Sequence, residues 1–421
     1  MNRRNFIKDT GLYSMGSLLI PFVMQGCSKP DPTLLVISGW QDVNIGDIAH
    51  TPGLLHILET FLPEANIILW KKSAGEEVKK LLNESFPKVK IIFGEVDQEK
   101  NVDSPEVLAA FDSADLMIHG SGPSVVGQVN LEAWVKHSNK PFGIFGTTIQ
   151  TINDNLKVLL QKASFIYTRE TASIKALEEA GITGEHISFA PDATFFLNLH
   201  DEAKAQQFLQ EHGLEEKKII CAIPRLRYTP YHKIRKVDWT EERIQMVESV
   251  NAETKEKDHA KLREAMITWV RETGNKVLIC PEMTYQVDIM DELLLDPLPE
   301  DVKPFVVKRG YWMPDEAASV YLHAHTVLSC ECHSPIMAIA NGTPAFYLRQ
   351  PTDTIKGQMY YDLNLSDWVF EIDETEGKQI SDTLMAVYND YDSAKLTVKK
   401  VNERIGGIYS NAVEVAKEAI G

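Results

Sequence analysis

Cysteine is scarce in this sequence, with five residues in 421, and one of them, Cys27, stands near the start. Cys330 and Cys332 lie closest together. Their Cys-x-Cys-His spacing differs from the Cys-x-x-Cys pairs of zinc sites, and no second cluster complements it. We therefore expect no bound metal, no disulfide framework, and two buried, inert thiols in this segment.

Positive charge is also in deficit, with 43 Lys and Arg against 60 Asp and Glu and a formal net charge of −17. Such a surface repels nucleic acids and anionic membranes, so neither is an expected partner of the general surface. The sequence has no Gly-x-Gly-x-x-Gly motif, no internal repeat and no low-complexity tract. A nicotinamide cofactor is therefore not implied, and we expect no cofactor.

The first 27 residues predict an export signal. Arg3-Arg4-Asn5-Phe6-Ile7-Lys8 resembles a twin-arginine motif, an apolar run follows at residues 18–24, and Gly26-Cys27 resembles a bacterial lipoprotein lipidation site. We expect a periplasmic or cell-surface protein whose membrane attachment is a lipid on Cys27. The alternative is a cytosolic protein with a signal-like N-terminus, and the oligomeric state is not indicated.

Apolar, strand-like runs alternate with amphipathic segments through the rest of the chain, which predicts an α/β fold with parallel sheets. Residues 33–39 form a nearly continuous apolar run, as expected for a strand buried on both faces. The pattern and length predict an N-terminal domain over residues 33–200, a C-terminal domain over 215–400 and a last helix over 401–421 that crosses back. Helices are expected at residues 50–61 and 260–273, and an insertion or helix pair at 237–257.

A strand, a polar loop, a helix and a second strand are predicted between residues 326 and 348, and the loop carries Glu331 and His333. Ser334 and Pro335 have the composition of a helix N-terminus, with the helix continuing over residues 336–340. Ligands of open α/β sheets bind at the carboxyl ends of strands, so we interpret Glu331 and His333 as candidate catalytic residues. A capping or buried structural histidine is the alternative.

Other polar residues follow predicted strands and are candidate substrate-binding residues. In the first half these are Asn44, Asp47, His119, Gly120, Ser121, Thr147 and Arg169; in the second half they are Arg225, Arg227, His232 and Lys356. Three of the latter lie in a basic, aromatic loop that predicts an anion site, with a solvated charge run as the alternative. Asp47 is expected either to cap the helix that starts near residue 50 or to bind a ligand hydroxyl.

Several short motifs, in order, resemble the polysaccharide pyruvyl transferase family between about residues 34 and 365. They are Asn44-Ile45-Gly46-Asp47, His119-Gly120-Ser121-Gly122, Thr168-Arg169-Glu170, Ala190-Pro191-Asp192, His333, Gly342-Thr343-Pro344 and Lys356. The resemblance implies two Rossmann-like domains facing a cleft, as in GT-B glycosyltransferases, and transfer of pyruvate as a ketal from phosphoenolpyruvate to a sugar of a glycan. It also implies that His333 is a catalytic acid or base. Under a transferase hypothesis we expect Arg225 to hold an acidic group and Lys356 to screen developing charge.

One position departs from the family pattern, which has arginine two residues before this histidine where the present chain has Glu331. Two further functions therefore stay open. One is a hydrolase that removes pyruvate ketals or related acidic groups, with Glu331 and His333 as acid and base; the other is a lipoprotein that binds acidic glycans without chemistry. A Glu331 carboxylate paired with Arg225 or Lys356 favours transfer or binding, and a free one near His333 favours hydrolysis.

Overall fold

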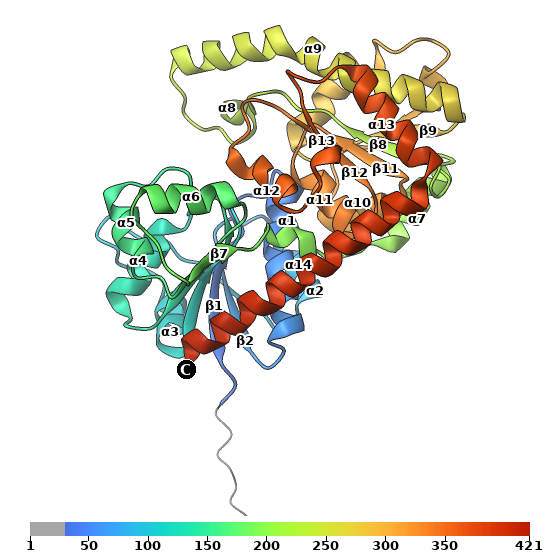
Figure 1. The fold of residues 1–421 in the computed structure, drawn as a ribbon. Coiled ribbons are helices and arrows are strands. Elements are labelled where there is room, and N and C mark those ends of the chain that lie inside the picture. Colours follow the sequence, from blue (N-terminus) through green and yellow to red (C-terminus); the bar gives the residue numbers. More distant parts are fainter. Residues whose placement is uncertain (1–29) are drawn as a thin grey trace, which may run out of the picture. The chain divides into compact units, whose positions relative to one another are not determined.

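Two parallel β-sheets organise the computed structural model, which describes residues 30–421 (Figure 1). The expected export signal and the lipidation site at Cys27 lie outside the described residues. The first sheet has the strand order β3-β2-β1-β4-β5-β6-β7, and all of its pairs are parallel. Its strands are β1 (Thr33–Ser38), β2 (Asn66–Lys71), β3 (Lys90–Ile92), β4 (Leu116–His119), β5 (Phe142–Thr147), β6 (Phe165–Thr168) and β7 (Ile187–Phe189).

The second sheet repeats this arrangement, with the order β10-β9-β8-β11-β12-β13 and parallel pairs throughout. Its strands are β8 (Ile219–Ile223), β9 (Lys276–Ile279), β10 (Val306–Lys308), β11 (Thr326–Ser329), β12 (Ala345–Arg349) and β13 (Val369–Glu371). In each sheet the first strand along the chain pairs with the fourth, and ligands of such sheets bind outside this switch point. The predicted α/β fold with two Rossmann-like domains is confirmed.

Helices connect the strands. The α-helices are α1 (Ile45–Phe61), α2 (Glu76–Ser85), α3 (Pro105–Ser113), α4 (Gln128–His137), α5 (Asp154–Leu160), α6 (Thr171–Glu179), α7 (Glu202–Glu211), α8 (Tyr231–Ile234), α9 (Glu241–Thr273), α10 (Pro314–His323), α11 (His333–Ala340), α12 (Gln358–Asp362), α13 (Gly377–Asn389) and α14 (Tyr391–Ile420). Short 3-10 or π turns are η1 (Ala193–Phe196), η2 (Thr284–Ile289), η3 (Asp291–Leu295), η4 (Lys303–Phe305), η5 (Ile355–Gly357) and η6 (Ser366–Trp368).

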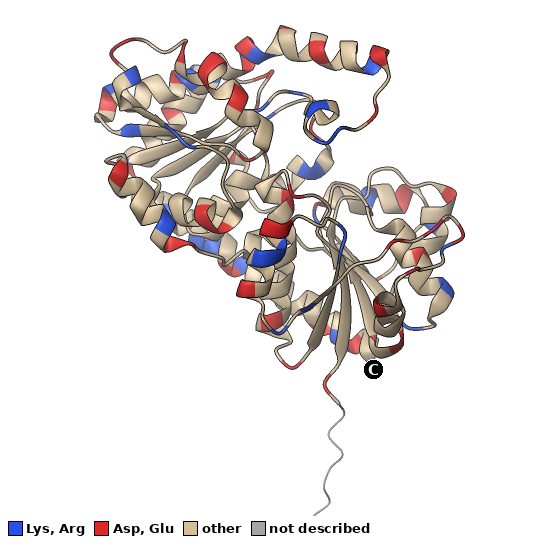
Figure 2. Cartoon of the chain, turned by 180° about the vertical axis from the view of Figure 1, so that it is seen from behind, with Lys and Arg blue, Asp and Glu red and all other residues tan. Residues whose placement is uncertain are grey.

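Apolar strands form the centre of both sheets. Leu34, Leu35, Val36 and Ile37 of β1 are fully buried, as parallel strands covered on both faces require. Lys, Arg, Asp and Glu lie mainly on helices and loops (Figure 2). One continuous apolar cluster includes strands of both sheets and residues of α1, α10, α11 and α14, and a second lies on the other face of the first sheet. Residues 32–421 therefore share a core and form one compact unit.

Two expected helix positions are corrected. α1 begins at Ile45 because the Asn44 side chain accepts hydrogen bonds from the backbone N–H groups of Gly46, at 2.7 Å, and Asp47, at 3.2 Å. Asp47 is therefore not the cap, and Pro52 lies inside the helix rather than in its first turn. Residues 237–257 do not form a helix pair, since α9 continues unbroken from Glu241 to Thr273.

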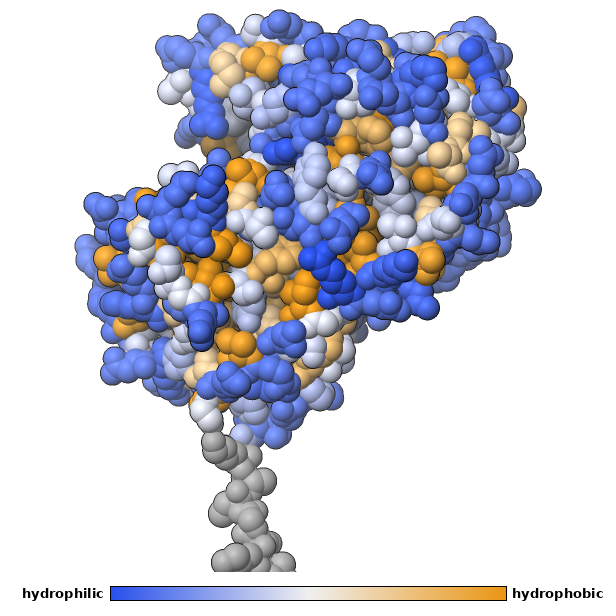
Figure 3. Space-filling view, in the orientation of Figure 1, coloured by the Kyte–Doolittle hydropathy of each residue, from blue (hydrophilic) through white to orange (hydrophobic). Residues whose placement is uncertain are grey.

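The last helix, α14, contacts elements of both halves: α11 and α13 of the second, and α1, η1 and β6 of the first (Figure 1). The Tyr409 hydroxyl donates to the backbone oxygen of Asp192 at 2.7 Å, so α14 also supports the segment before η1. Polar residues cover most of the face seen in Figure 3. None of the helices within residues 30–421 is long and apolar enough to span a membrane.

Candidate active site

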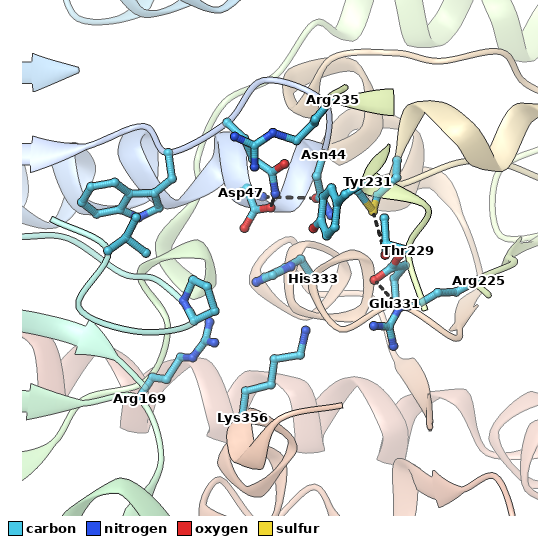
Figure 4. A pocket seen from close by; sticks show the side chains of 15 residues that line it. Asn44, Asp47, Arg169, Arg225, Thr229, Tyr231, Arg235, Glu331, His333 and Lys356 are labelled. Carbon is cyan, nitrogen blue, oxygen red and sulfur yellow. Dashed lines mark hydrogen bonds and ion pairs between the residues drawn. The ribbon is translucent and has the colours of Figure 1, made fainter. Parts of the chain in front are cut away.

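A cavity of about 340 Å³ lies where loops at the carboxyl ends of strands from both sheets meet (Figure 4). Loops after β1, β4 and β6 form one part of its wall, and segments after β8, β9, β11 and β12 form the other. The lining includes four cations and two carboxylates, namely Arg169, Arg225, Arg235 and Lys356 with Asp47 and Glu331. The cavity is thus a cationic site in a protein of net charge −17, which favours an anionic ligand.

His333 stands at the centre of this cavity, as the first residue of α11, with only 5% of its surface exposed (Figure 4). Its Nδ1 is 3.3 Å from Glu282 Oε1. Its Nε2 is 3.1 Å from His50 Nε2 and 3.8 Å from Asp192 Oδ2. Because His50 and Asp192 belong to the first half of the chain and Glu282 to the second, the imidazole joins the two halves.

Glu282 also caps the N-terminus of α11, the helix that carries His333. Its Oε2 accepts hydrogen bonds from the Ser334 backbone N–H at 2.6 Å and from the Ser334 hydroxyl at 2.8 Å. The residue before the helix, Cys332, makes no side-chain cap. The expectation that Ser334 caps a helix over residues 336–340 is therefore wrong, because a carboxylate from the loop after β9 satisfies the N–H groups that a local cap would bind.

Gly46 permits the close approach of α1 to His333. A Cβ atom at this position would lie 2.3 Å from Cβ and 2.5 Å from Nδ1 of His333, far inside van der Waals contact. The glycine of the Asn44-Ile45-Gly46-Asp47 motif is thus required by a contact with a residue 287 positions later in the chain. The motif serves the interface between the two halves.

The charge of His333 follows from these neighbours. Burial alone would lower the pKa of its imidazole, but Asp192 and Glu282 outweigh this effect and raise the pKa to about 9. Burial would raise the pKa of Glu282 as well, yet the hydrogen bond with His333 lowers it. At neutral pH the site therefore holds an imidazolium between carboxylates, which is a group able to donate a proton.

Asp47, His50 and His333 have potential ligand atoms within 4.8 Å of one another, a spacing that a metal ion could use. Metal ligation needs neutral imidazole nitrogens. His333 instead has both nitrogens within reach of protein partners and a pKa raised to about 9. We therefore interpret Asp47, His50 and His333 as a cluster that holds a proton rather than a metal ion.

Glu331 is paired rather than free. Its Oε2 lies 3.3 Å from Arg225 Nε, and its Oε1 accepts a hydrogen bond from Gln286 Nε2 at 2.7 Å. Arg225 has a second and closer carboxylate, Asp353. Burial raises the pKa of Glu331 to about 8, although Arg225 lowers it, so the carboxyl is largely neutral at pH 7.

Two other cations, Arg169 and Lys356, line the cavity. Arg169 is almost fully buried; its Nε donates to Thr148 Oγ1 at 2.6 Å and its Nη1 to Asp192 Oδ2 at 2.8 Å. Its Nη2 is buried without a hydrogen-bond partner among residues 30–421. Figure 4 shows Arg169 and Lys356 pointing into the space beside His333, with no interaction drawn at Lys356.

The cavity brings together seven of the residues expected from sequence: Asn44, Asp47, Arg169, Arg225, Glu331, His333 and Lys356. The others have structural contacts outside its lining. Arg227 is bound by the carboxylates of Asp258 and Asp373, and His232 stacks on Trp239 and lines a separate cavity. The remaining four, His119, Gly120, Ser121 and Thr147, are buried behind the cavity wall at the end of β4 and β5. Asn44 lines the cavity, but its side chain is the cap of α1.

Sequence reasoning missed His50, Asp192 and Glu282 as members of the site. His50 lies four residues after Gly46, which places both on one face of α1, so helical spacing held a signal. Asp192 belongs to a motif that carried the family resemblance. Glu282 follows β9 closely, and its position at a strand end was its one signal.

The buried cysteines agree with their expected inert role. Cys330 and Cys332 are free and buried, and burial raises the pKa of the Cys332 thiol to about 12. Neither is a thiolate at neutral pH.

Two sheets with Rossmann strand order and a cationic cavity at the strand ends of both define a two-domain α/β protein of GT-B type. A putative UDP-N-acetylglucosamine 2-epimerase from Listeria monocytogenes has this fold, with a TM-score of 0.59 and 12% identity over 92% of this chain and 96% of that one. The UDP-GlcNAc 2-epimerase of Neisseria meningitidis bound to UDP-GlcNAc has a TM-score of 0.57 and 11% identity, over 92% of this chain and 100% of that one. MnaA of S. aureus in a co-structure with UDP has a TM-score of 0.56 and 10% identity, over 91% of this chain and 94% of that one. At these identities the likeness shows the fold alone.

The sequence matches the polysaccharide pyruvyl transferase family over residues 44–350. The chain belongs to this family, and the resemblance inferred from its motifs is confirmed. A comparison with curated proteins finds no match.

Gly46→Ala tests the contact between α1 and His333. Overpacking of this kind costs about 1–3 kcal/mol, against a gain of up to ~1 kcal/mol from replacing glycine inside a helix. We expect a net loss of stability in urea unfolding. The matched control is Gly406→Ala in α14, where a Cβ would meet nothing within 4 Å, so that variant should be stabilised. Equal stability of the two variants would contradict the assigned contact.

Glu282→Gln tests the origin of the His333 charge. Removing the carboxylate should lower the pKa of His333, now about 9, by at least about one pH unit, read from the imidazole resonances in NMR titration. Because the pKa of His333 is higher in the folded protein than its ordinary value of 6.5, protonated His333 stabilises the fold fully below pH 6.5. This stabilisation is lost as pH rises through about 9, and the variant should lose part of it. Glu316→Gln, which removes a buried carboxylate paired with Arg309, should leave the His333 titration unchanged.

Proposed function

We propose that the protein is a pyruvyl transferase that moves the pyruvyl group of phosphoenolpyruvate, as a ketal, onto a sugar of a glycan. The observation that supports this most directly is the set of cavity cations around His333, above all Arg169, with its unpartnered Nη2, and Lys356. A donor with a phosphate and a carboxylate needs cationic partners for both groups. The family and the similar solved structures with UDP or UDP-GlcNAc support a sugar substrate.

His333 has the properties of the general acid that this reaction needs. Protonation of the donor methylene carbon turns it into a methyl group, while one acceptor hydroxyl adds to the neighbouring carbon. The bond from that carbon to the phosphate oxygen then breaks and a second hydroxyl closes the ketal. Of the two hydroxyl protons, one leaves on phosphate and the other restores the His333 imidazolium. The imidazolium can supply the first proton because its pKa, about 9, keeps it charged at neutral pH.

Glu331, at the family's arginine position, fits this scheme through its contacts. Arg225 supplies a guanidinium close to that place, and Asp353 is its nearer carboxylate. Since burial raises the pKa of Glu331 to about 8, its carboxyl adds little repulsion toward an anionic donor at pH 7. A hydrolytic acid and base pair would instead need a free Glu331 carboxylate beside His333.

Incubation of the purified protein with phosphoenolpyruvate and a panel of glycans should release phosphate and yield pyruvylated sugar. The rate should fall about tenfold per pH unit above pH 9, because the proton-donating form of His333 is lost as pH rises through its pKa. His333→Asn should remove turnover. Absence of phosphate release with every acceptor, or an undiminished rate well above pH 9, would contradict the proposal.

Glu331→Gln separates transfer from hydrolysis. Glutamine matches the neutral carboxyl in shape and can still contact Arg225, so kcat for phosphate release should stay within about threefold of the wild-type value. Asp353→Asn is the comparison, because it removes the nearer anion of a buried Arg225 and should be more harmful. Loss of all turnover in Glu331→Gln would favour Glu331 as an acid or base.

A further inference from the structure

Trp40 forms a rigid part of the cavity wall that the proposed chemistry leaves unused. It follows β1 and lines the cavity. Its indole Nε1 donates a hydrogen bond to the backbone oxygen of Ser121 at 2.6 Å. One face of the ring stacks on His119, with centroids 4.8 Å apart and planes at 27°. Two independent contacts therefore hold the ring in one orientation.

The residues beneath Trp40 are built around the ring. His119 Nε2 accepts a hydrogen bond from the Gly127 N–H at 3.0 Å, and burial lowers the pKa of His119 to about 3, so its ring is neutral. A Cβ at Gly127 would lie 3.1 Å from the His119 ring and 3.2 Å from the indole. The small-residue loop after β4 thus fits closely under an aromatic platform.

Trp40 shares its part of the cavity wall with polar and apolar side chains. Its neighbours along the chain are Gln41 and Asp47, which line the cavity together with apolar Pro123 and Val126. The Gln41 amide N–H donates to the Asp47 carboxylate, which leaves the amide oxygen and a carboxylate oxygen as acceptors. Aromatic surface, apolar contacts and a carboxylate acceptor, with Arg235 as a further hydrogen-bond donor of the lining, suit a polyhydroxylated ring.

We propose that the indole of Trp40 is the platform on which a pyranose ring of the acceptor stacks, with Asp47 and Gln41 binding its hydroxyl groups. This subsite rests on the proposed transferase function, for which it would hold the second substrate. Asp47 follows Gly46, which lies against His333, so a hydroxyl bound by Asp47 is next to the proposed acid. The donor and the acceptor would then occupy adjacent parts of one cavity.

Saturation-transfer NMR tests the subsite without any turnover. The full chain is mixed with the methyl pyranosides of glucose, galactose, mannose and N-acetylglucosamine, without phosphoenolpyruvate. Each sugar is present at about 20 mM, a concentration at which millimolar binding is detected. We expect transfer to ring protons of at least one sugar. Trp40→Ala should weaken that binding about tenfold, whereas Trp40→Phe should retain most of it. Wild-type protein that binds none of the four sugars would overturn the proposal.

Matched measurements separate this proposal from the transferase function. Trp239→Ala removes a tryptophan that does not line this cavity and should leave sugar binding unchanged. Binding of inorganic phosphate should be equal in wild type and Trp40→Ala, which also shows that the variant is folded. If sugar binding depends on Trp40 but the protein releases no phosphate from phosphoenolpyruvate, the sugar subsite is supported and the transferase function is contradicted. Phosphate release with an acceptor KM unchanged in Trp40→Ala would reject the subsite and keep the transferase.

Discussion

A buried positive charge at His333 is the constraint on which the site depends. Burying an unpaired charge costs several kcal/mol, so the imidazolium requires carboxylates at contact distance. Glu282 comes from the second half and Asp192 from the first, and both must be in place at once. The packing of α1 against α11, with Gly46 at the closest point, is the geometry that satisfies this requirement.

The cations around this centre are mostly paired with internal carboxylates. Arg225, Arg227 and Arg169 each have such a partner, and Figure 4 shows Arg169 and Lys356 pointing into the space beside His333. The surrounding protein carries a net charge of −17, so an anion that enters finds its partners in the cavity rather than on the surface. Trp40, Pro123 and Val126 add an aromatic and apolar part to the same lining.

Solved structures with 10–12% identity share the same two-sheet fold, and a fold by itself does not define the chemistry of a site. In both sheets the loops at the switch point between first and fourth strands reach the cavity. What distinguishes this chain is the content of those loops. Glu331, for example, stands where the family pattern has arginine, and Arg225 supplies a guanidinium beside it.

The sequence by itself determined the class of fold, the longer strands and the strand ends that carry ligand-facing residues, because apolar periodicity and turn residues are local signals. It also identified His333, Glu331, Arg225, Arg169 and Lys356 as cavity residues. The three-residue strands β7 and β13 carry too little periodicity to predict. Only the tertiary structure decided that Glu282 caps α11, that His50 and Asp192 reach His333, and that His119 supports Trp40. These roles depend on contacts between residues up to 283 positions apart, which local sequence does not encode.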